Sequence, residues 1–149
     1  MSQALVKAQN FCVYQERYQQ EVRDKIYEWG LHKADVESII AELISENFIS
    51  EERYAKAFAG GKFRIKKWGR VKIKMELKKR HLSDYCINKG LKEINDKDYT
   101  DTIKKIIQKK SLAIGEKNAF KKKHQIGQYL ISRGFEPDIV WGEMGLSKI

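Results

Sequence analysis

The chain has little proline, little cysteine and no long apolar run. Of its 149 residues one is proline and two are cysteine, Cys12 and Cys86, which lie 74 residues apart. That spacing matches no metal-binding or redox motif, so both are expected to be small buried apolar side chains in a reducing compartment. No stretch approaches about 18 consecutive apolar residues. Residues 1–20 contain no signal-peptide core. These absences predict a cytoplasmic protein without a membrane span.

Signatures of catalysis and of cofactor binding are also missing. The three histidines, His32, His81 and His124, have no ligand spacing with one another or with the cysteines. There is no Walker loop, no G-x-G-x-x-G and no G-x-S-x-G. Glu51 and Glu52 are adjacent, so on a helix their carboxylates point apart, and they fit the electrostatics of a helix start. We therefore expect no enzyme activity, no cofactor and no metal site.

Strand signals are equally scarce, whereas helical spacing recurs along the chain. No convincing alternating run and no Asn-Gly or Asp-Gly turn is present. Apolar residues three or four apart predict helices over about 3–18, 20–29, 33–47, 70–80, 96–110 and 116–133, with others starting near Ser50, Ser83 and Pro137. Ser50 is expected to cap its helix. The fold is therefore predicted to be all-α.

The helical pattern occurs three times. The segments V-RDKIYEWGL, I-KMELKKRHL and I-GQYLISRGF begin at Val22, Ile73 and Ile126 and align without gaps, at spacings of 51 and 53 residues. Repetition at this period indicates modules stacked in a row, each too small to bury its apolar face alone. The sequence therefore predicts three tandem three-helix repeats in an elongated, curved, right-handed array, with repeats at 1–49, 50–95 and 96–149.

Positive charge is concentrated in one stretch. The formal net charge of the chain is +10, and residues 62–80 alone carry ten cations against one acid, Glu76, a net of +9. Residues 104–124 carry a net of +7, whereas residues 1–52 carry −5. Cations crowded together without acids destabilise a fold unless a polyanion or an acidic partner relieves them. We therefore favour a binding surface over a merely solvated face.

The candidate contact residues are cations of the two basic stretches. Neutralising several phosphates with them predicts binding that weakens steeply with salt, and arginines also pair bidentately with carboxylates. The predicted contacts to DNA or a partner protein are Lys62, Arg64, Lys66, Lys67, Arg70, Lys72, Lys74, Lys78, Lys79, Arg80, Lys105, Lys109, Lys121, Lys122 and Lys123. Trp68 has two interpretations, stacking on a base or, more often for such a residue, packing at a helix junction.

Over nearly its whole length the chain resembles the RecX family, the regulators of the bacterial RecA recombinase. The resemblance rests on S-EERYAKAF from Ser50, W-GRVKIKMELKKRHL from Trp68, S-DYCINKGLKEI from Ser83 and I-GQYLISRGFEPDIV from Ile126. One departure is Gly60-Gly61, which stands where a continuing helix is expected.

The resemblance implies three tandem three-helix repeats without catalysis, bound in the groove of the RecA–DNA filament and bridging neighbouring subunits. It further implies inhibition of strand exchange, of RecA ATPase and of RecA-stimulated repressor cleavage, and so a role in DNA repair, recombination and the SOS response. The expected partners are the RecA filament and the phosphates of single- and double-stranded DNA, with the protein acting as a monomer. The alternative is a general helical DNA- or RNA-binding protein without a recombinase partner.

Overall fold

The computed structural model describes residues 2–146, and over that range the chain forms helices and loops without a strand. The elements are α1 (Ser2–Tyr14), α2 (Gln19–Glu28), α3 (Lys33–Ser45), α4 (Glu51–Gly61), a π-helical turn η1 (Lys62–Lys66), α5 (Arg70–Lys79), α6 (Asp84–Leu91), α7 (Asp96–Ala113), α8 (Ala119–Ser132) and α9 (Pro137–Glu143). The predicted all-α class is confirmed. Residues 1 and 147–149, at the ends of the first and third predicted repeats, lie outside the described residues.

Local sequence determines where several helices start. Ser50, Ser83, Asn95 and Asn118 each accept, through a side-chain oxygen, a hydrogen bond from a backbone N–H in the first turn of the following helix. Such a cap satisfies one of the N–H groups that a helix start leaves free. The expected cap at Ser50 is confirmed, and the Asn118 cap starts α8 at Ala119, later than the predicted 116.

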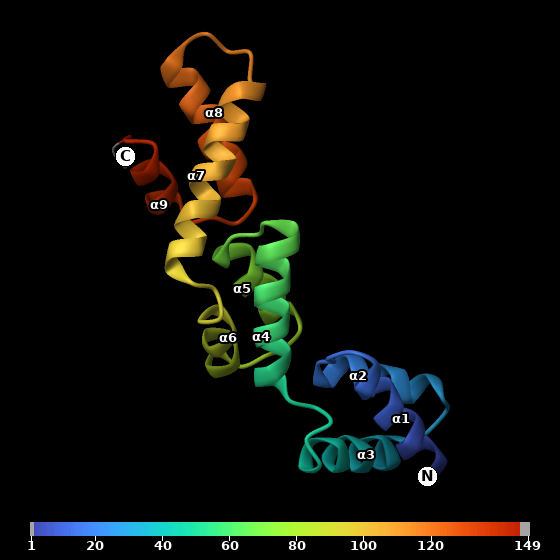
Figure 1. The fold of residues 1–149 in the computed structure, drawn as a ribbon. Helices are drawn as coiled ribbons and strands as arrows, with labels where there is room; N and C mark the ends of the chain where they lie inside the picture. Colours follow the sequence, from blue (N-terminus) through green and yellow to red (C-terminus); the bar gives the residue numbers. More distant parts are fainter. Residues whose placement is uncertain (1, 147–149) are drawn as a thin grey trace.

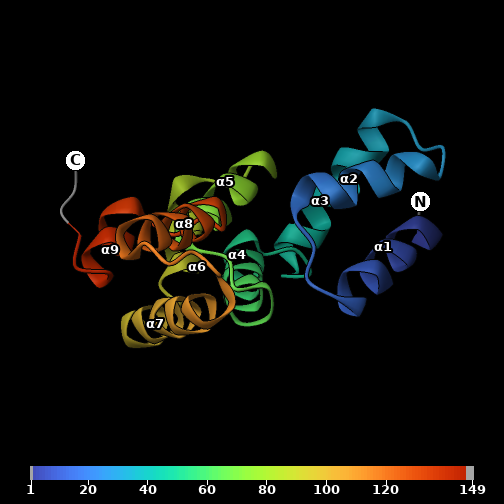
Figure 2. The same ribbon diagram turned by 90° about the horizontal axis from the view of Figure 1, so that it is seen from above.

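The helices of residues 2–146 lie in three successive groups of three. We call α1–α3 the first helix group, α4–α6 with η1 the second, and α7–α9 the third. Figure 1 shows the first group at one end of an elongated molecule, the second in the middle and the third at the other end. The view from above in Figure 2 shows the same separation of α1–α3 from α7–α9. The three three-helix units agree with the prediction, whereas the exact repeat limits and the hand of the array stay predictions.

The apolar side chains form two separate cores. One lies within the first helix group, and the other runs continuously through the second and third groups. At the first two aligned apolar positions of the sequence repeat every residue is buried, namely Val22, Ile26, Ile73, Leu77, Ile126 and Leu130. At the third, Leu82 and Phe135 are buried and Leu31 is partly buried. The second and third groups therefore form one packed body, to which the first group adds a core of its own.

Small residues bring α4 and α6 into close contact. A Cβ added to Gly90 of α6 would lie 2.6 Å from the carbonyl oxygen of Ala55 in α4, so glycine is what lets the two backbones touch. Ala55 and Ala59 are fully buried on the facing side of α4. On the same helix the chain passes through Gly60 and Gly61 in helical conformation and continues into η1.

Gly90→Ala is expected to lower the free energy of unfolding by about 1–3 kcal/mol, because the added methyl group overpacks the contact between α4 and α6. The matched control is Gly61→Ala, since Gly61 has helical backbone angles and nothing within 4 Å of the added Cβ. That control is expected to gain about 0.5–1 kcal/mol, because alanine loses less backbone entropy than glycine in a helix. Urea unfolding followed by circular dichroism measures both. Equal stability of the two variants would contradict the close approach at Gly90.

Candidate nucleic-acid and partner interface

The basic run 62–80 does not form one strip on the folded chain. It passes through η1, a short loop and α5, and these elements turn its cations toward different surroundings. Two arginines lie in joints between helix groups, two lysines lie against a tryptophan, and the remaining cations are exposed or at the surface. Each of these three sets of cations makes different contacts.

Arg70 lies in the joint between the second and third helix groups. Its Nη2 is 2.6 Å from Asp96 Oδ1, its Nη1 is 3.2 Å from Glu136 Oε2, and its guanidinium carbon lies 3.9 Å from the centre of the Tyr99 ring. The Tyr99 hydroxyl donates to Glu136 and accepts from the backbone N–H of Arg70 at 2.9 Å. Burial, together with the bond to Glu136, raises the pKa of Tyr99 far above its usual range. Tyr99 therefore stays a neutral donor in this network.

Backbone contacts complete the same joint. The N–H of Gly69 donates to the carbonyl of Arg133 at 2.9 Å, and the N–H of Val71 donates to the carbonyl of Gly134 at 2.9 Å. The free N–H groups at the start of α5 thus satisfy free carbonyls at the end of α8. A Cβ on Gly69 would lie 2.3 Å from the backbone of Gly134, which itself has a φ of +97°. Two glycines are therefore needed for this end-to-end contact.

Arg80, at the end of α5, lies in the joint with the first helix group. Its guanidinium carbon is 4.7 Å from the centre of the Phe58 ring and 5.7 Å from that of Tyr18. Its Nη1 donates to the carbonyl of Glu76 at 2.8 Å. Hydrogen bonds from Lys79 and Arg80 hold the pKa of the Glu76 carboxyl below its usual range. The sequence predicts Arg70, Lys79 and Arg80 as contacts to another molecule. In the structure each of the three pairs with a carboxylate of this chain.

Trp68 packs at a helix junction and carries lysines on its ring. It lies edge-on to Phe58, with ring centres 6.2 Å apart, and is half-buried against the core. Lys62 Nζ lies 5.0 Å and Lys72 Nζ 4.5 Å from the centre of the Trp68 ring. Of the two interpretations of Trp68, the structure shows packing. Lys62 and Lys72 are half-buried beside it.

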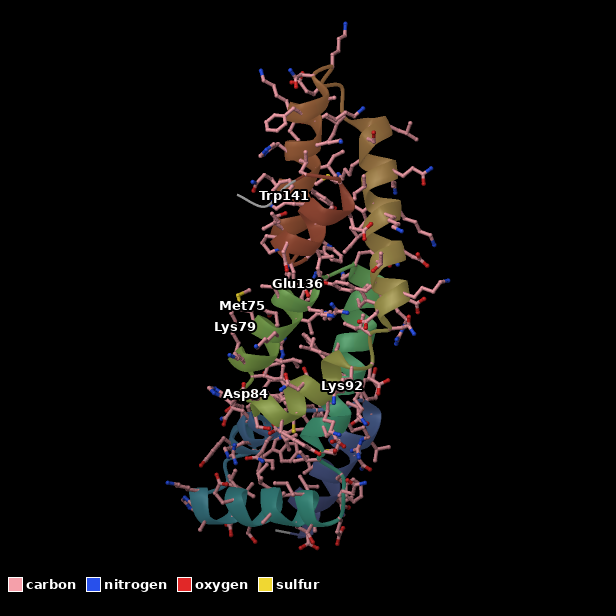
Figure 3. All side chains as sticks on the ribbon, turned by 90° about the vertical axis from the view of Figure 1, so that its left-hand side faces the viewer. Met75, Lys79, Asp84, Lys92, Glu136 and Trp141 are labelled. Atoms are coloured by element: carbon pink, nitrogen blue, oxygen red, sulfur yellow. The ribbon has the colours of Figure 1, made fainter. Side chains whose placement is uncertain are left out.

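An exposed face of α5 combines lysines with apolar side chains. Lys74 and Lys78 are exposed four residues apart, and Val71 and Met75 beside them are 52% and 49% exposed. Within residues 2–146 neither lysine lies within salt-bridge distance of a carboxylate. Figure 3 shows Met75 projecting from α5 on the side away from α7. We call Val71, Lys74, Met75 and Lys78 the α5 surface.

Other cations, exposed or partly buried, meet in a cavity between the second and third helix groups, which we call the inter-group cavity. Its volume is about 280 Å³, and five of its eight lining residues are cationic and none is acidic. Its lining residues are Lys66 and Lys67 at the end of η1, Ile106, Lys109, Lys110 and Ala113 of α7, and Tyr129 and Arg133 at the end of α8. Three of these, Lys66, Lys67 and Lys109, are predicted contact residues that the fold brings together.

Sequence reasoning missed Arg133 and Tyr129 as cavity residues. Both lie in a segment whose pattern of apolar residues is typical of an ordinary amphipathic helix. The repeat alignment offers one signal, because it places Arg133 at the position of Arg80 in the basic repeat. The remaining predicted contacts stay at the surface of η1, α7 and α8, and their role stays a prediction. They are Arg64, Lys105, Lys121, Lys122 and Lys123.

Metal ligands and a membrane span are not found in the part of the chain that the structure describes. No three His, Cys, Asp or Glu side chains gather there as a metal site would require, and none of its helices has the length and hydropathy to cross a bilayer. Both cysteines are free thiols, Cys12 buried and Cys86 half-buried. Burial raises the pKa of the Cys12 thiol to about 11, so it is poorly reactive near neutral pH.

Family models match the second and third helix groups. The model of the second three-helix domain of RecX matches residues 50–91, and that of the third three-helix domain of RecX matches residues 96–142. The regulatory protein RecX of Clostridium acetobutylicum is 29% identical over 143 residues, which cover 93% of this chain and 64% of that protein. The regulatory protein RecX of Clostridium perfringens strain 13 is 29% identical over 122 residues, covering 80% of this chain and 57% of that protein. The chain thus spans between half and two thirds of the length of these curated relatives.

Solved structures show the same fold. The crystal structure of RecX from Lactobacillus salivarius superposes with a TM-score of 0.88 at 25% identity, over 97% of this chain and 94% of that one. A second crystal structure, of a regulatory protein RecX, gives a TM-score of 0.84 at 18% identity, over 95% of this chain and 69% of that one. At 18% identity, the likeness to this second structure concerns the fold alone.

Arg70→Met is expected to lower the free energy of unfolding by about 1.5–3 kcal/mol, because it leaves the partly buried Glu136 and Tyr99 without their cation. Asp96 adds little to this loss, since its side chain is 97% exposed. The matched control is Lys74→Met on the exposed α5 surface, which is expected to change stability by less than about 0.5 kcal/mol. Urea unfolding compares the two. If Arg70→Met were as mild as the control, Arg70 would be free to serve as a surface contact.

Proposed function

The chain belongs to the RecX family of regulatory proteins, and from this premise we propose that it binds RecA and its DNA filament and inhibits the recombinase, ATPase and coprotease activities of RecA. It thereby modulates recombination, DNA repair and the SOS response. It acts as a monomer in the cytoplasm, contacts single- and double-stranded DNA through phosphates, and needs no cofactor. The support comes from family membership and from the exposed cations of the second and third helix groups.

The α5 surface is the observation that carries the proposal. A face that only needs to stay hydrated does not require Val71 and Met75, which are about half exposed beside Lys74 and Lys78. Methionine adapts to irregular apolar partners, and unpaired lysines attract acidic groups over a distance and fix the orientation of docking. This mixture suits a protein surface that offers both apolar and acidic groups better than it suits DNA phosphates alone.

The charge distribution determines which helix group of the chain faces the DNA of such a filament. Residues 1–50 carry five cations and eight acids, a net of −3, so DNA phosphates repel the first helix group, whereas the net of +9 over residues 62–80 draws the second group toward them. The elongated arrangement of the three groups in Figure 1 allows contacts with more than one filament subunit. A chain that bridges subunits in this way opposes both strand exchange and the subunit movements of the ATPase cycle.

A second function, general nucleic-acid binding without a recombinase partner, is favoured by one observation. The inter-group cavity carries five cations and no acid, which is suited to phosphate in any strand. The two functions differ in their target. If the protein retards bare DNA as strongly as RecA-coated DNA and leaves RecA ATPase unchanged, the general function replaces the proposed one.

The double variant Lys74→Glu/Lys78→Glu is expected to raise the concentration needed for half-inhibition of RecA ATPase on single-stranded DNA by about tenfold or more, because two attractive charges become repulsive. The assay is a titration of RecA ATPase with the protein at fixed salt. Inhibition by the wild-type protein is expected to weaken as salt rises.

The matched control is Lys33→Glu/Lys92→Glu, which makes the same change in net charge at two exposed lysines outside both basic stretches. It is expected to inhibit within about twofold of wild type, since distant exposed charges are screened. Equal inhibition by the two double variants would show that the α5 surface makes no specific contact and would remove it from the proposal.

A further inference from the structure

The inter-group cavity gathers cations that nothing in the described chain neutralises. Lys66 and Lys67 enter it from the second helix group, Lys109 and Lys110 from α7, and Arg133 from α8, and no acidic residue lines it. Like charges held together in this way raise the free energy of the folded chain. An anion bound between them would remove that repulsion, so the cavity is electrostatically prepared for one.

The backbone that carries Lys67 into the cavity is strained. Lys67 has φ 57° and ψ 43°, a left-handed conformation that crowds the Cβ of any residue except glycine. It directly follows the π-helical turn η1, an element that is rare and recurs at functional sites. Glycine would remove the strain at this position. Asn47 and His81 have a similar positive φ just after other helices, so several helices of the chain end in this way, and what Lys67 adds to the cavity is its cation.

Contacts within the wall hold the cavity in shape before any ligand arrives. Arg133 Nη2 donates to the backbone carbonyl of Lys66 and so ties α8 to the end of η1. Lys110 Nζ lies 4.0 Å from the centre of the Tyr129 ring, which fixes a cation and an aromatic side chain side by side. A site whose groups are already positioned loses less entropy when it binds.

Size and lining together select the ligand. The volume of about 280 Å³ is too small for a duplex to enter but accommodates one nucleotide unit. Its cations match the oxygens of a phosphate group, which carries one negative charge in a strand and up to two in a free nucleotide. Ile106, Ala113 and the Tyr129 ring give an apolar wall for the sugar or base. This combination of charge and apolar wall is what one nucleotide requires.

We propose that the inter-group cavity binds one phosphorylated nucleotide unit, supplied by a single DNA strand or by a free nucleotide, and that the bound unit fastens the second helix group to the third. This proposal rests on the proposed function only in assuming that a DNA strand is present, and it does not involve RecA. The fastening follows because the walls of the cavity belong to both groups, so a ligand that contacts both opposes their separation.

The test compares variants that block the cavity, remove a charge from it or relieve its strain. Ala113→Trp fills the cavity from the exposed end of α7 without changing charge, and Lys109→Ala removes one cation. Both are expected to weaken binding of a fluorescent short oligothymidylate, by about tenfold for Ala113→Trp and about threefold for Lys109→Ala. The control Lys92→Ala removes one exposed cation outside both basic stretches and is expected to stay within about twofold. Fluorescence anisotropy measures the affinities, and circular dichroism verifies the fold of each variant.

Thermal unfolding supplies an independent measurement. Oligothymidylate and thymidine monophosphate are added in turn and are expected to raise the melting temperature of wild type and of Lys92→Ala, but not that of Ala113→Trp. A rise with both ligands assigns the site to single nucleotides, and a rise with the oligomer alone assigns it to a strand. Lys67→Gly is expected to melt at a higher temperature than wild type and yet to bind oligothymidylate more weakly, because it loses both the strain and a cation.

Three outcomes would overturn the proposal. Ala113→Trp could bind oligothymidylate as wild type does, in which case the cations act as a diffuse surface. Inorganic phosphate could raise the melting temperature as much as the nucleotides in both wild type and Ala113→Trp, which would indicate nonspecific anion binding. An oligoglutamate peptide could bind more tightly than oligothymidylate and be blocked by Ala113→Trp, which would assign the cavity to a protein. Because none of these measurements contains RecA, failure here leaves the α5 contact standing, and failure of RecA inhibition leaves the cavity standing.

Discussion

The end-to-end joint between α8 and α5 is the contact on which the rest of the structure depends. Backbone N–H groups at the start of α5 bind carbonyls at the end of α8, and Arg70, Tyr99 and Glu136 surround that contact with charge and hydrogen bonds. The shared apolar core then makes the second and third helix groups one body. The first group keeps a core of its own, and its joint with the second group combines Arg53 Nε 2.6 Å from Glu16, the packing of Tyr18 against Tyr54, and the Arg80 guanidinium 5.7 Å from the Tyr18 ring. The chain therefore combines one firm joint with one that is more easily separated.

The sequence repeat determines these joints as well as the cores. Tyr54 and Tyr99 align when Ile49 is matched with Ile94, and each packs against an aromatic ring of the preceding helix group. Tyr54 lies against Tyr18 with ring centres 5.3 Å apart, and Tyr99 lies against Phe63 with ring centres 5.6 Å apart. Arg80 and Arg133 are likewise equivalent in sequence. Arg80 lies over a ring of the first group, whereas Arg133 donates to the backbone of the second. A tandem array needs its neighbours to fit one another, and here the same positions supply that fit at both joints.

Much of the fold can be predicted from the sequence because its determinants are local. Helix caps at Ser50 and Ser83 lie beside the helices they start, and the buried repeat positions follow from a period that needs no knowledge of the tertiary fold. The division of the basic run cannot be predicted in this way. Arg70 meets Asp96 and Glu136, which are 26 and 66 residues further along the chain, and Arg133 meets the carbonyl of Lys66 across 67 residues. A charge count along the sequence cannot distinguish a cation that has a distant partner from one that has none.

The positions that give up stability coincide with the positions proposed to bind. Lys67 is strained, the cavity cations repel one another, and Met75 exposes half of its apolar side chain. Arg70, by contrast, joins the second and third helix groups, and Arg80 is held by Glu76 of its own helix beside the Tyr18 ring of the first group. In the proposed complex the α5 surface and the inter-group cavity belong to the same rigid body, so a contact made at one raises the effective concentration of the other at its own target. Such coupling needs the joint at Gly69 and Gly134 to stay closed, since a flexible joint would let the cavity walls separate while the α5 surface remained bound. The stiffness of the joint at Gly69 and Gly134 would therefore let two modest contacts, at the α5 surface and in the inter-group cavity, act together as one bridge between their targets.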